Sequence, residues 1–142
     1  MDRPWPPRAP DDVGVYVHFP WCRRLCPYCD FPVMVAVDAP PHRDYLALVL
    51  DELAAQAPGF AGRSLATIYL GGGTPSWWDP ACIAELIAAI RTTFPGAPAE
   101  VTVEANPIDC TPSTMAAWRA AGVTRLSIGV QAWTDAELAA LG

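Results

Sequence analysis

The sequence predicts an α/β protein built from parallel strand–helix units. Short runs of β-branched and aromatic residues alternate four times with longer segments whose apolar residues recur at helical spacing. Hydrophobic residues make up 52% of the 142 residues and charged residues 17%, so the chain can bury the core of one ordinary domain. Repeated strand–helix units form parallel sheets with right-handed crossovers. We therefore expect four such units in one domain.

The first unit spans residues 14–56. Residues 14–19 (GVYVHF) are predicted to form a strand that ends at Pro20, and a loop rich in cysteine follows. Residues 42–56 are predicted to form the first helix, because their apolar positions fall on one helical face. These positions are Tyr45, Leu46, Val49, Leu50 and Leu53.

The second unit starts with a short buried strand over residues 67–70, which leads into a glycine-rich turn. A helix follows with clear start signals. Asp79 can cap it, and Pro80 occupies a first-turn position where a missing N–H costs nothing. Its predicted apolar stripe consists of Ile83, Leu86, Ile87 and Ile90.

The third unit consists of a strand over residues 101–105 and a helix with a start signal and a stop signal. Thr111 is its predicted cap, Pro112 its first residue and Gly122 its stop. Within this helix, Met115 and Trp118 are expected to face inward.

The fourth unit has a predicted strand over residues 125–129 and a helix opened by Thr134 and Glu137 at capping-box spacing. Four units cannot close a (β/α) barrel, so the sequence is expected to be a fragment of a protein of several hundred residues. We assign residues 1–12 to a flexible Pro-rich leader and residues 13–142 to the N-terminal portion of the core domain, with a C-terminal domain expected to lie outside the fragment.

Charge and hydropathy argue against several classes of protein. The net charge is −6 and lysine is absent, which argues against a nucleic-acid-binding surface. No apolar run approaches the roughly 18 residues of a membrane span, and residues 1–10 have no signal-peptide core. A cytosolic protein without a transmembrane segment is expected. In that reducing compartment the five cysteines would not form structural disulfides.

Three cysteines carry the most specific chemistry of the sequence. Cys22, Cys26 and Cys29 have C-x3-C-x2-C spacing directly after a strand, and soft sulfur ligands suit an iron–sulfur cluster or zinc. Three thiolates would leave one iron of a 4Fe–4S cluster open to a substrate or cofactor. A structural zinc site or an electron-transfer cluster is the alternative, although zinc would need a second ligand pair. Cys82 and Cys110 are interpreted as small buried hydrophobic residues.

Four groups follow the carboxyl ends of successive predicted strands: the cysteine loop, the glycine turn at residues 71–74, Glu104 and Gln131. Parallel α/β barrels place their active sites at this end of the sheet. A carboxylate such as Glu104 is costly to bury unpaired, and a polar ligand would remove that cost. The spacing predicts that the four groups meet at the carboxyl edge of the sheet.

Four motifs in order resemble the HemN/HemW family of the radical S-adenosylmethionine (SAM) superfamily. They are Y-V-H-F-P-W-C at residues 16–22, G-G-G-T-P-S at 71–76, E-A-N-P at 104–107 and R-L-S-I-G-V-Q at 125–131. The resemblance spans nearly the whole chain. It implies a partial TIM-like (β/α) barrel and a 4Fe–4S cluster whose open iron chelates SAM and whose reduction cleaves the sulfonium to a 5′-deoxyadenosyl radical.

The resemblance also implies individual roles. Cys22, Cys26 and Cys29 match the cluster ligands. Each of the other matches also has a structural alternative. The tyrosines could be ordinary core residues, the glycines could serve a plain tight turn, and the glutamate and glutamine could be solvated loop residues. The residues that match SAM contacts are Tyr16, Tyr28, Gly72, Gly73, Thr74, Glu104 and Gln131.

Asp30 distinguishes two branches of the family. The branch that oxidises coproporphyrinogen usually has a further cysteine at this position, whereas the heme-chaperone branch resembles this sequence there. The resemblance thus favours a heme chaperone that binds heme and hands it to acceptor proteins. Its alternative is oxygen-independent coproporphyrinogen III dehydrogenase, an enzyme that decarboxylates propionate side chains.

The partners implied by the resemblance are a tetrapyrrole, either heme or coproporphyrinogen III, heme-acceptor proteins, and an electron donor such as flavodoxin or ferredoxin. No residue of the sequence identifies a heme ligand. His18 and His42 are interpreted as structural residues, because the first lies inside the cysteine-loop motif and the second opens a surface helix.

Overall fold

The structure, a computed structural model, describes residues 11–142. The predicted leader, residues 1–12, lies almost wholly outside the described residues. Its last residue, Asp12, already belongs to the first strand, which begins two residues earlier than predicted.

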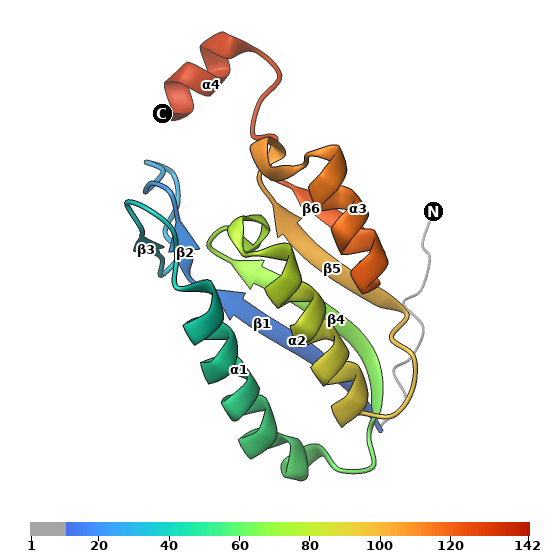
Figure 1. The fold of residues 1–142 in the computed structure, drawn as a ribbon. Helices are drawn as coiled ribbons and strands as arrows, with labels where there is room; N and C mark the ends of the chain where they lie inside the picture. Colours follow the sequence, from blue (N-terminus) through green and yellow to red (C-terminus); the bar gives the residue numbers. More distant parts are fainter. Residues whose placement is uncertain (1–10) are drawn as a thin grey trace.

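Four parallel strands form one sheet in the order β1–β4–β5–β6 (Figure 1). They are β1 (Asp12–Phe19), β4 (Ser64–Gly72), β5 (Glu100–Ala105) and β6 (Arg125–Ile128). Each pairs in parallel with its neighbour, so all carboxyl ends lie at one edge. The predicted α/β class and parallel sheet are confirmed.

Three helices cover one face of this sheet: α1 (His42–Gln56), α2 (Pro80–Thr93) and α3 (Pro112–Ala121) (Figure 1). The core fills the space between the two layers. Its fully buried large side chains include Phe19, Ile68, Leu70, Trp78, Ile83, Leu86, Ile87, Ile90, Val101, Val103 and Trp118.

The helix ends agree with the predicted start and stop signals. Asp79 accepts a hydrogen bond from the Ala81 N–H over 2.8 Å, and Thr111 accepts one from the Thr114 N–H over 3.2 Å. Gly122 ends α3 in the left-handed conformation, with φ of 94°. These contacts satisfy backbone groups that have no partner inside the helix.

The predicted inward orientation of Met115 is wrong. Its side chain is 44% exposed, whereas Trp118 is 1% exposed in the same helix. Met115 and Trp118 are three positions apart, which separates their side chains by about 60° around a helix of 3.6 residues per turn. Because the buried stripe of α3 is narrow, this angle is enough to expose one of them. Met115 therefore lies at the margin of the buried face.

Strand β4 extends beyond its predicted bounds into the glycine turn. Gly71 and Gly72 pair with His18 and Phe19 of β1, so the parallel ladder continues where the sequence indicates a turn. Near the start of the pairing, a shift in register falls between Val13 and Gly14.

Short elements at the strand ends were not predicted. Pro20 interrupts β1, but the chain continues as β2 (Trp21–Cys22), which pairs in parallel with β3 (Met34–Val35). Single-turn 3-10 helices follow α1, β4 and β5. These are η1 (Ala57–Phe60), η2 (Pro75–Trp77) and η3 (Pro107–Asp109).

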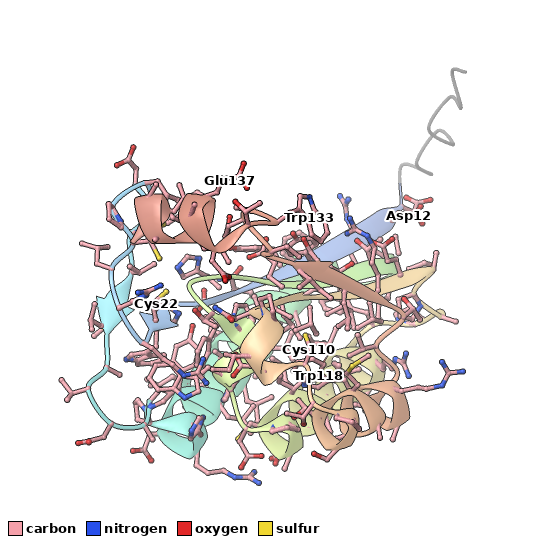
Figure 2. All side chains as sticks on the ribbon, turned by 90° about the horizontal axis from the view of Figure 1, so that it is seen from above. Asp12, Cys22, Cys110, Trp118, Trp133 and Glu137 are labelled. Carbon is pink, nitrogen blue, oxygen red and sulfur yellow. The ribbon has the colours of Figure 1, made fainter. Side chains whose placement is uncertain are left out.

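Helix α4 (Asp135–Leu141) lies beyond the carboxyl edge of the sheet. Seen from above, it lies on the side of the sheet away from α1–α3 and close to the loop that carries Cys22 (Figure 2). The predicted capping box is present, since Thr134 and Glu137 bond to each other's backbone N–H groups. At its end, an added Cβ on Gly142 would lie 3.0 Å from Pro27.

Within residues 11–142, none of the helices combines the length and the apolar character that crossing a membrane requires.

Candidate functional site

The candidate site lies at the carboxyl ends of the strands, where four loops gather. The cysteine loop (residues 22–33) follows β1 and β2, the glycine turn (residues 71–74) closes β4, and Glu104 and Gln131 lie at and beyond the ends of β5 and β6. Hydrogen bonds join the first three: Thr74 bonds Cys22, and Gly72 bonds Glu104.

Gln131 stands apart from that network. Its side chain makes no hydrogen bond to the other three groups within the described chain. It is also the one non-glycine among residues 11–142 with a positive φ, 67°. A left-handed backbone at a residue that is not glycine carries a conformational cost and re-aims the side chain. The amide of Gln131 lies against Gly129, where an added Cβ would come within 2.8 Å of its nitrogen.

The cysteine loop presents three free, partly exposed thiols. The Cys29 N–H donates to the Cys26 carbonyl over 3.0 Å, and the Thr74 hydroxyl donates to the Cys22 sulfur over 3.4 Å. Burial raises the pKa of Cys22 above its ordinary value, with smaller contributions from Cys26 and Cys29. Among residues 11–142, no three His, Cys, Asp or Glu side chains are grouped as a ready metal site.

This donor set fits a cluster with three protein ligands. Cys82 is fully buried in the core, as predicted, and Cys110 is partly buried against it with its thiol directed at the Asn106 carbonyl. Neither joins the loop. A tetrahedral zinc site needs four ligands, whereas three thiolates suffice for a cubane cluster that keeps one iron open.

The glycine turn packs directly on the start of the cysteine loop. Gly72 has φ of 111°, and a Cβ there would lie 2.7 Å from the His18 ring. A Cβ on Gly73 would lie 2.7 Å from the Trp21 carbonyl, and its N–H donates to the Phe19 carbonyl over 2.7 Å. Glycine is required here because the His18 ring and the protein's own backbone occupy the space that a side chain would fill.

Glu104 already has two protein partners, which corrects the expectation that a ligand would be needed to offset its burial. The Tyr69 hydroxyl donates to its Oε1 over 2.6 Å, and the Gly72 N–H donates to its Oε2 over 3.1 Å. The hydrogen bond to Glu104 is the main cause that raises the pKa of Tyr69. The carboxylate is thereby fixed beside the glycine turn.

Sequence reasoning missed Tyr69. Only the register of the strands brings it to Glu104: Tyr69 pairs with Thr102, and a Cβ added on Gly71 would lie 3.2 Å from Glu104 Oε2. A residue without a side chain at that point lets the carboxylate reach across to the tyrosine.

Both tyrosines of the predicted site are exposed, so neither is an ordinary core residue. Tyr16 is 57% exposed and Tyr28 is 48% exposed. The Tyr16 hydroxyl hydrogen-bonds His18 Nδ1 over 3.0 Å, and its ring stacks on Tyr69 at 6.0 Å between centroids. A hydrogen bond with Cys26 is the main cause that raises the pKa of Tyr28.

The sheet face away from α1–α3 is polar at the strand ends. Side chains alternate between the two faces of a strand. The apolar positions face the helices, and a second set of mostly polar and aromatic residues faces the opposite side. An ion pair between Arg125 and Glu100, at 3.5 Å, lies on that second face. The set comprises Tyr16, His18, Tyr69, Thr102, Glu104, Arg125 and Ser127.

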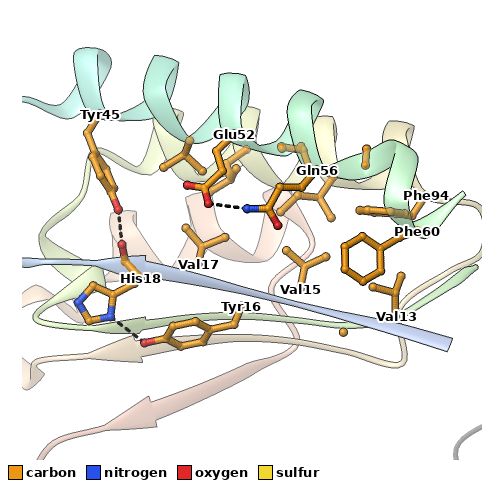
Figure 3. Close-up of a pocket in the computed structure, with 16 residues that line it drawn as sticks. Val13, Val15, Tyr16, Val17, His18, Tyr45, Glu52, Gln56, Phe60 and Phe94 are labelled. Carbon is orange, nitrogen blue, oxygen red and sulfur yellow. Dashed lines mark hydrogen bonds between the residues drawn. The ribbon is translucent and has the colours of Figure 1, made fainter.

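A cavity of about 330 Å³ opens between β1 and α1 (Figure 3). Its walls include Val13, Val15 and Val17, with a hydrogen bond from Gln56 to Glu52 at its side. At one end, the Tyr45 hydroxyl donates to the His18 carbonyl. Tyr16 and His18 also line it, but none of the three loop cysteines does, so we do not assign it to the cofactor site.

Comparisons with known proteins agree with this geometry. A profile of the radical SAM superfamily matches residues 16–141. The heme chaperone HemW of Escherichia coli is 38% identical over 131 residues, which cover 92% of this chain and 35% of that protein. The oxygen-independent coproporphyrinogen III oxidase of the same organism is 35% identical over 120 residues, 84% of this chain and 26% of the oxidase.

A solved structure shares the fold. The coproporphyrinogen III oxidase HemN from Escherichia coli, described as a radical SAM enzyme, matches with a TM-score of 0.80 and 33% identity over 92% of this chain and 30% of its own. The chain thus spans about a third of the length of the proteins it matches. Because the superfamily profile covers most of the sequence and the fold agrees, the chain belongs to the radical SAM superfamily.

Proposed function

We propose that Cys22, Cys26 and Cys29 hold a 4Fe–4S cluster and that the loops around them bind SAM. The observation that carries this proposal is the hydrogen-bonded assembly of three loops at one sheet edge: Thr74 on Cys22, and Gly72 on Glu104. When bound, the cluster would supply an open iron and the electron for reductive cleavage of SAM.

The surrounding residues would bind and orient SAM. Glu104 offers a carboxylate held by two donors, one of which, the Gly72 N–H, places it beside the glycine turn. Tyr28 stands beside Cys26, next to the proposed cluster. The proposed SAM contacts are Tyr16, Tyr28, Gly72, Gly73, Thr74, Glu104 and Gln131.

For the whole protein, we propose a HemW-like heme chaperone that binds heme in the cytoplasm and transfers it to acceptor proteins. The similarity to the Escherichia coli heme chaperone over 92% of this chain supports this assignment. Asp30, where the coproporphyrinogen-oxidising branch usually has cysteine, supports it independently. A flavodoxin or ferredoxin is the proposed electron donor.

Oxygen-independent coproporphyrinogen III dehydrogenase is the second candidate. The match to the Escherichia coli oxidase, in sequence and in fold, favours it. It differs from the first candidate in its product, since decarboxylation removes carbon dioxide from propionate groups whereas transfer leaves heme unchanged.

One experiment separates the two. The full-length protein, with reconstituted cluster, SAM and a reductant, is incubated anaerobically with coproporphyrinogen III, and in parallel its heme-loaded form is mixed with a heme-free acceptor protein. We expect unchanged coproporphyrinogen by mass spectrometry and transfer of the heme absorbance band to the acceptor. Formation of protoporphyrinogen that disappears in the Cys26→Ala variant would overturn the chaperone proposal.

A further inference from the structure

An ion pair joins the cysteine loop to the loop that follows β5. Arg23 directly follows Cys22, and its guanidinium donates to both carboxylate oxygens of Asp109, over 2.6 and 3.1 Å. The two residues are 86 positions apart. The Asp109 side chain is only 10% exposed and that of Arg23 is 41% exposed. A bidentate pair of this kind fixes orientation as well as distance.

Asp109 is itself held in place. The Ser76 hydroxyl donates to Asp109 Oδ2 over 2.7 Å and accepts a hydrogen bond from the Asn106 N–H over 2.9 Å. Ser76 is 4% exposed and lies in η2, directly after the glycine turn. Arg23 therefore binds an acceptor that is anchored to the loops of both β4 and β5.

The same guanidinium also lies over the ring of Trp77. The central carbon of the Arg23 guanidinium lies 4.6 Å from the centroid of the Trp77 ring. Arginine can use its edge for a carboxylate and its face for an aromatic ring at the same time, and lysine can do neither equally well.

The cysteine loop makes few other side-chain contacts with the loops after β4 and β5, although Pro27 lies against Gly142 at the end of α4. Cys22 is held by Thr74 and by the pairing of β2 with β3. Within the described chain, residues 23–28 make no other ion pair or side-chain hydrogen bond to the loops after β4 and β5. Arg23 thus provides a side-chain link between the segment that directly follows Cys22 and the loops after β4 and β5.

We propose that Arg23 is a positioning residue for the cofactor site. Through Asp109, Ser76 and Trp77, it holds the segment between Cys22 and Cys26 against the loops that carry the glycine turn and Glu104. This inference rests on the proposed cofactor site, and it makes Arg23 and Asp109 a functional pair although neither is a ligand.

The test compares Arg23→Gln, Arg23→Lys and Asp109→Asn in the full-length protein. Arg24→Gln is the matched control, because Arg24 lies on the same loop and makes no ion pair within the described residues. Without the cluster, alkylation of each cysteine by iodoacetamide is followed by mass spectrometry. The fully buried Cys82 serves as an internal reporter of global unfolding.

We expect Cys26 and Cys29 to react about five- to tenfold faster in Arg23→Gln and Asp109→Asn, as for loss of a partly exposed charged hydrogen-bond pair. Arg23→Lys should fall between these and the wild type. Arg24→Gln, which removes an equal charge from the same loop, should change the rates less than about twofold. In the reconstituted protein, the SAM-induced change in the cluster's EPR signal should need several-fold more SAM in Arg23→Gln.

Unchanged rates at Cys26 and Cys29, or an equal acceleration at Cys82, would overturn the inference, since the second result reports only a loss of overall stability. A wild-type protein that forms no SAM-responsive cluster would refute the proposed function instead. The alkylation measurement distinguishes these failures because it requires no cluster.

Discussion

Glu104 shows how a single residue of the site is set by its neighbours. Its carboxylate bonds a tyrosine hydroxyl and a backbone N–H, both from β4. A carboxylate held by two donors keeps one orientation, so little conformational entropy is lost when a ligand binds it. We therefore treat Tyr69 as a positioning residue for Glu104.

Replacing Tyr69 by phenylalanine should weaken SAM binding about three- to tenfold, because Glu104 loses one neutral hydrogen bond and its fixed orientation. Isothermal titration of SAM into the reconstituted full-length protein measures the change. Tyr45→Phe is the matched control, since it removes a hydroxyl that donates to the His18 carbonyl and does not contact Glu104. Equal weakening in both variants would contradict the assigned role.

Gly72 has a backbone conformation and close neighbours that both disfavour a side chain. Because φ is 111° and the His18 ring and the Phe19 carbonyl lie within 3.0 Å of an added Cβ, Gly72→Ala should lower the free energy of unfolding by about 1 to 3 kcal/mol. Urea unfolding followed by circular dichroism tests this.

Gly59→Ala provides the control for that measurement. No atom lies within 4 Å of a Cβ added at Gly59, so this variant should match the wild type or be slightly more stable. A Gly72 variant as stable as the Gly59 variant would show that the turn tolerates a side chain.

At the scale of elements, capping chemistry and apolar periodicity predict the helices well. The predicted bounds of α1 and the caps of α2 and α3 agree with the structure, because the signals are local. The pairing of β2 with β3 could not be predicted, since it joins two-residue strands whose register depends on the loop between them. The inward placement of Met115 failed because spacing alone does not define the width of the buried stripe.

The cap of α2 gives a test at this scale. Asp79→Ala removes the acceptor for the Ala81 N–H and should lower the free energy of unfolding by about 1 kcal/mol. Asp51→Ala is the control, because this exposed residue lies inside α1, where alanine is the better helix former. Denaturation midpoints of the two full-length variants should therefore move in opposite directions, and a shared direction would contradict the capping role.

At the scale of the whole molecule, parallel strands bring distant segments to one edge. The sequence alone predicts that the cysteine loop, the glycine turn, Glu104 and Gln131 meet there. Hydrogen bonds join the first three in the structure, whereas Gln131 makes none to them within the described residues. The contacts of Arg23 with Asp109 and of Tyr69 with Glu104 could not be predicted in this way. They depend on register and side-chain geometry between segments 35 to 86 residues apart.

The most direct test of the central claim is EPR of the anaerobically reconstituted full-length protein, with and without SAM, beside its Cys22→Ala, Cys26→Ala and Cys29→Ala variants. We predict a reduced 4Fe–4S signal that changes when SAM is added and is lost in each variant. Stoichiometric zinc, or a cluster whose signal is indifferent to SAM, would contradict the proposed cofactor site.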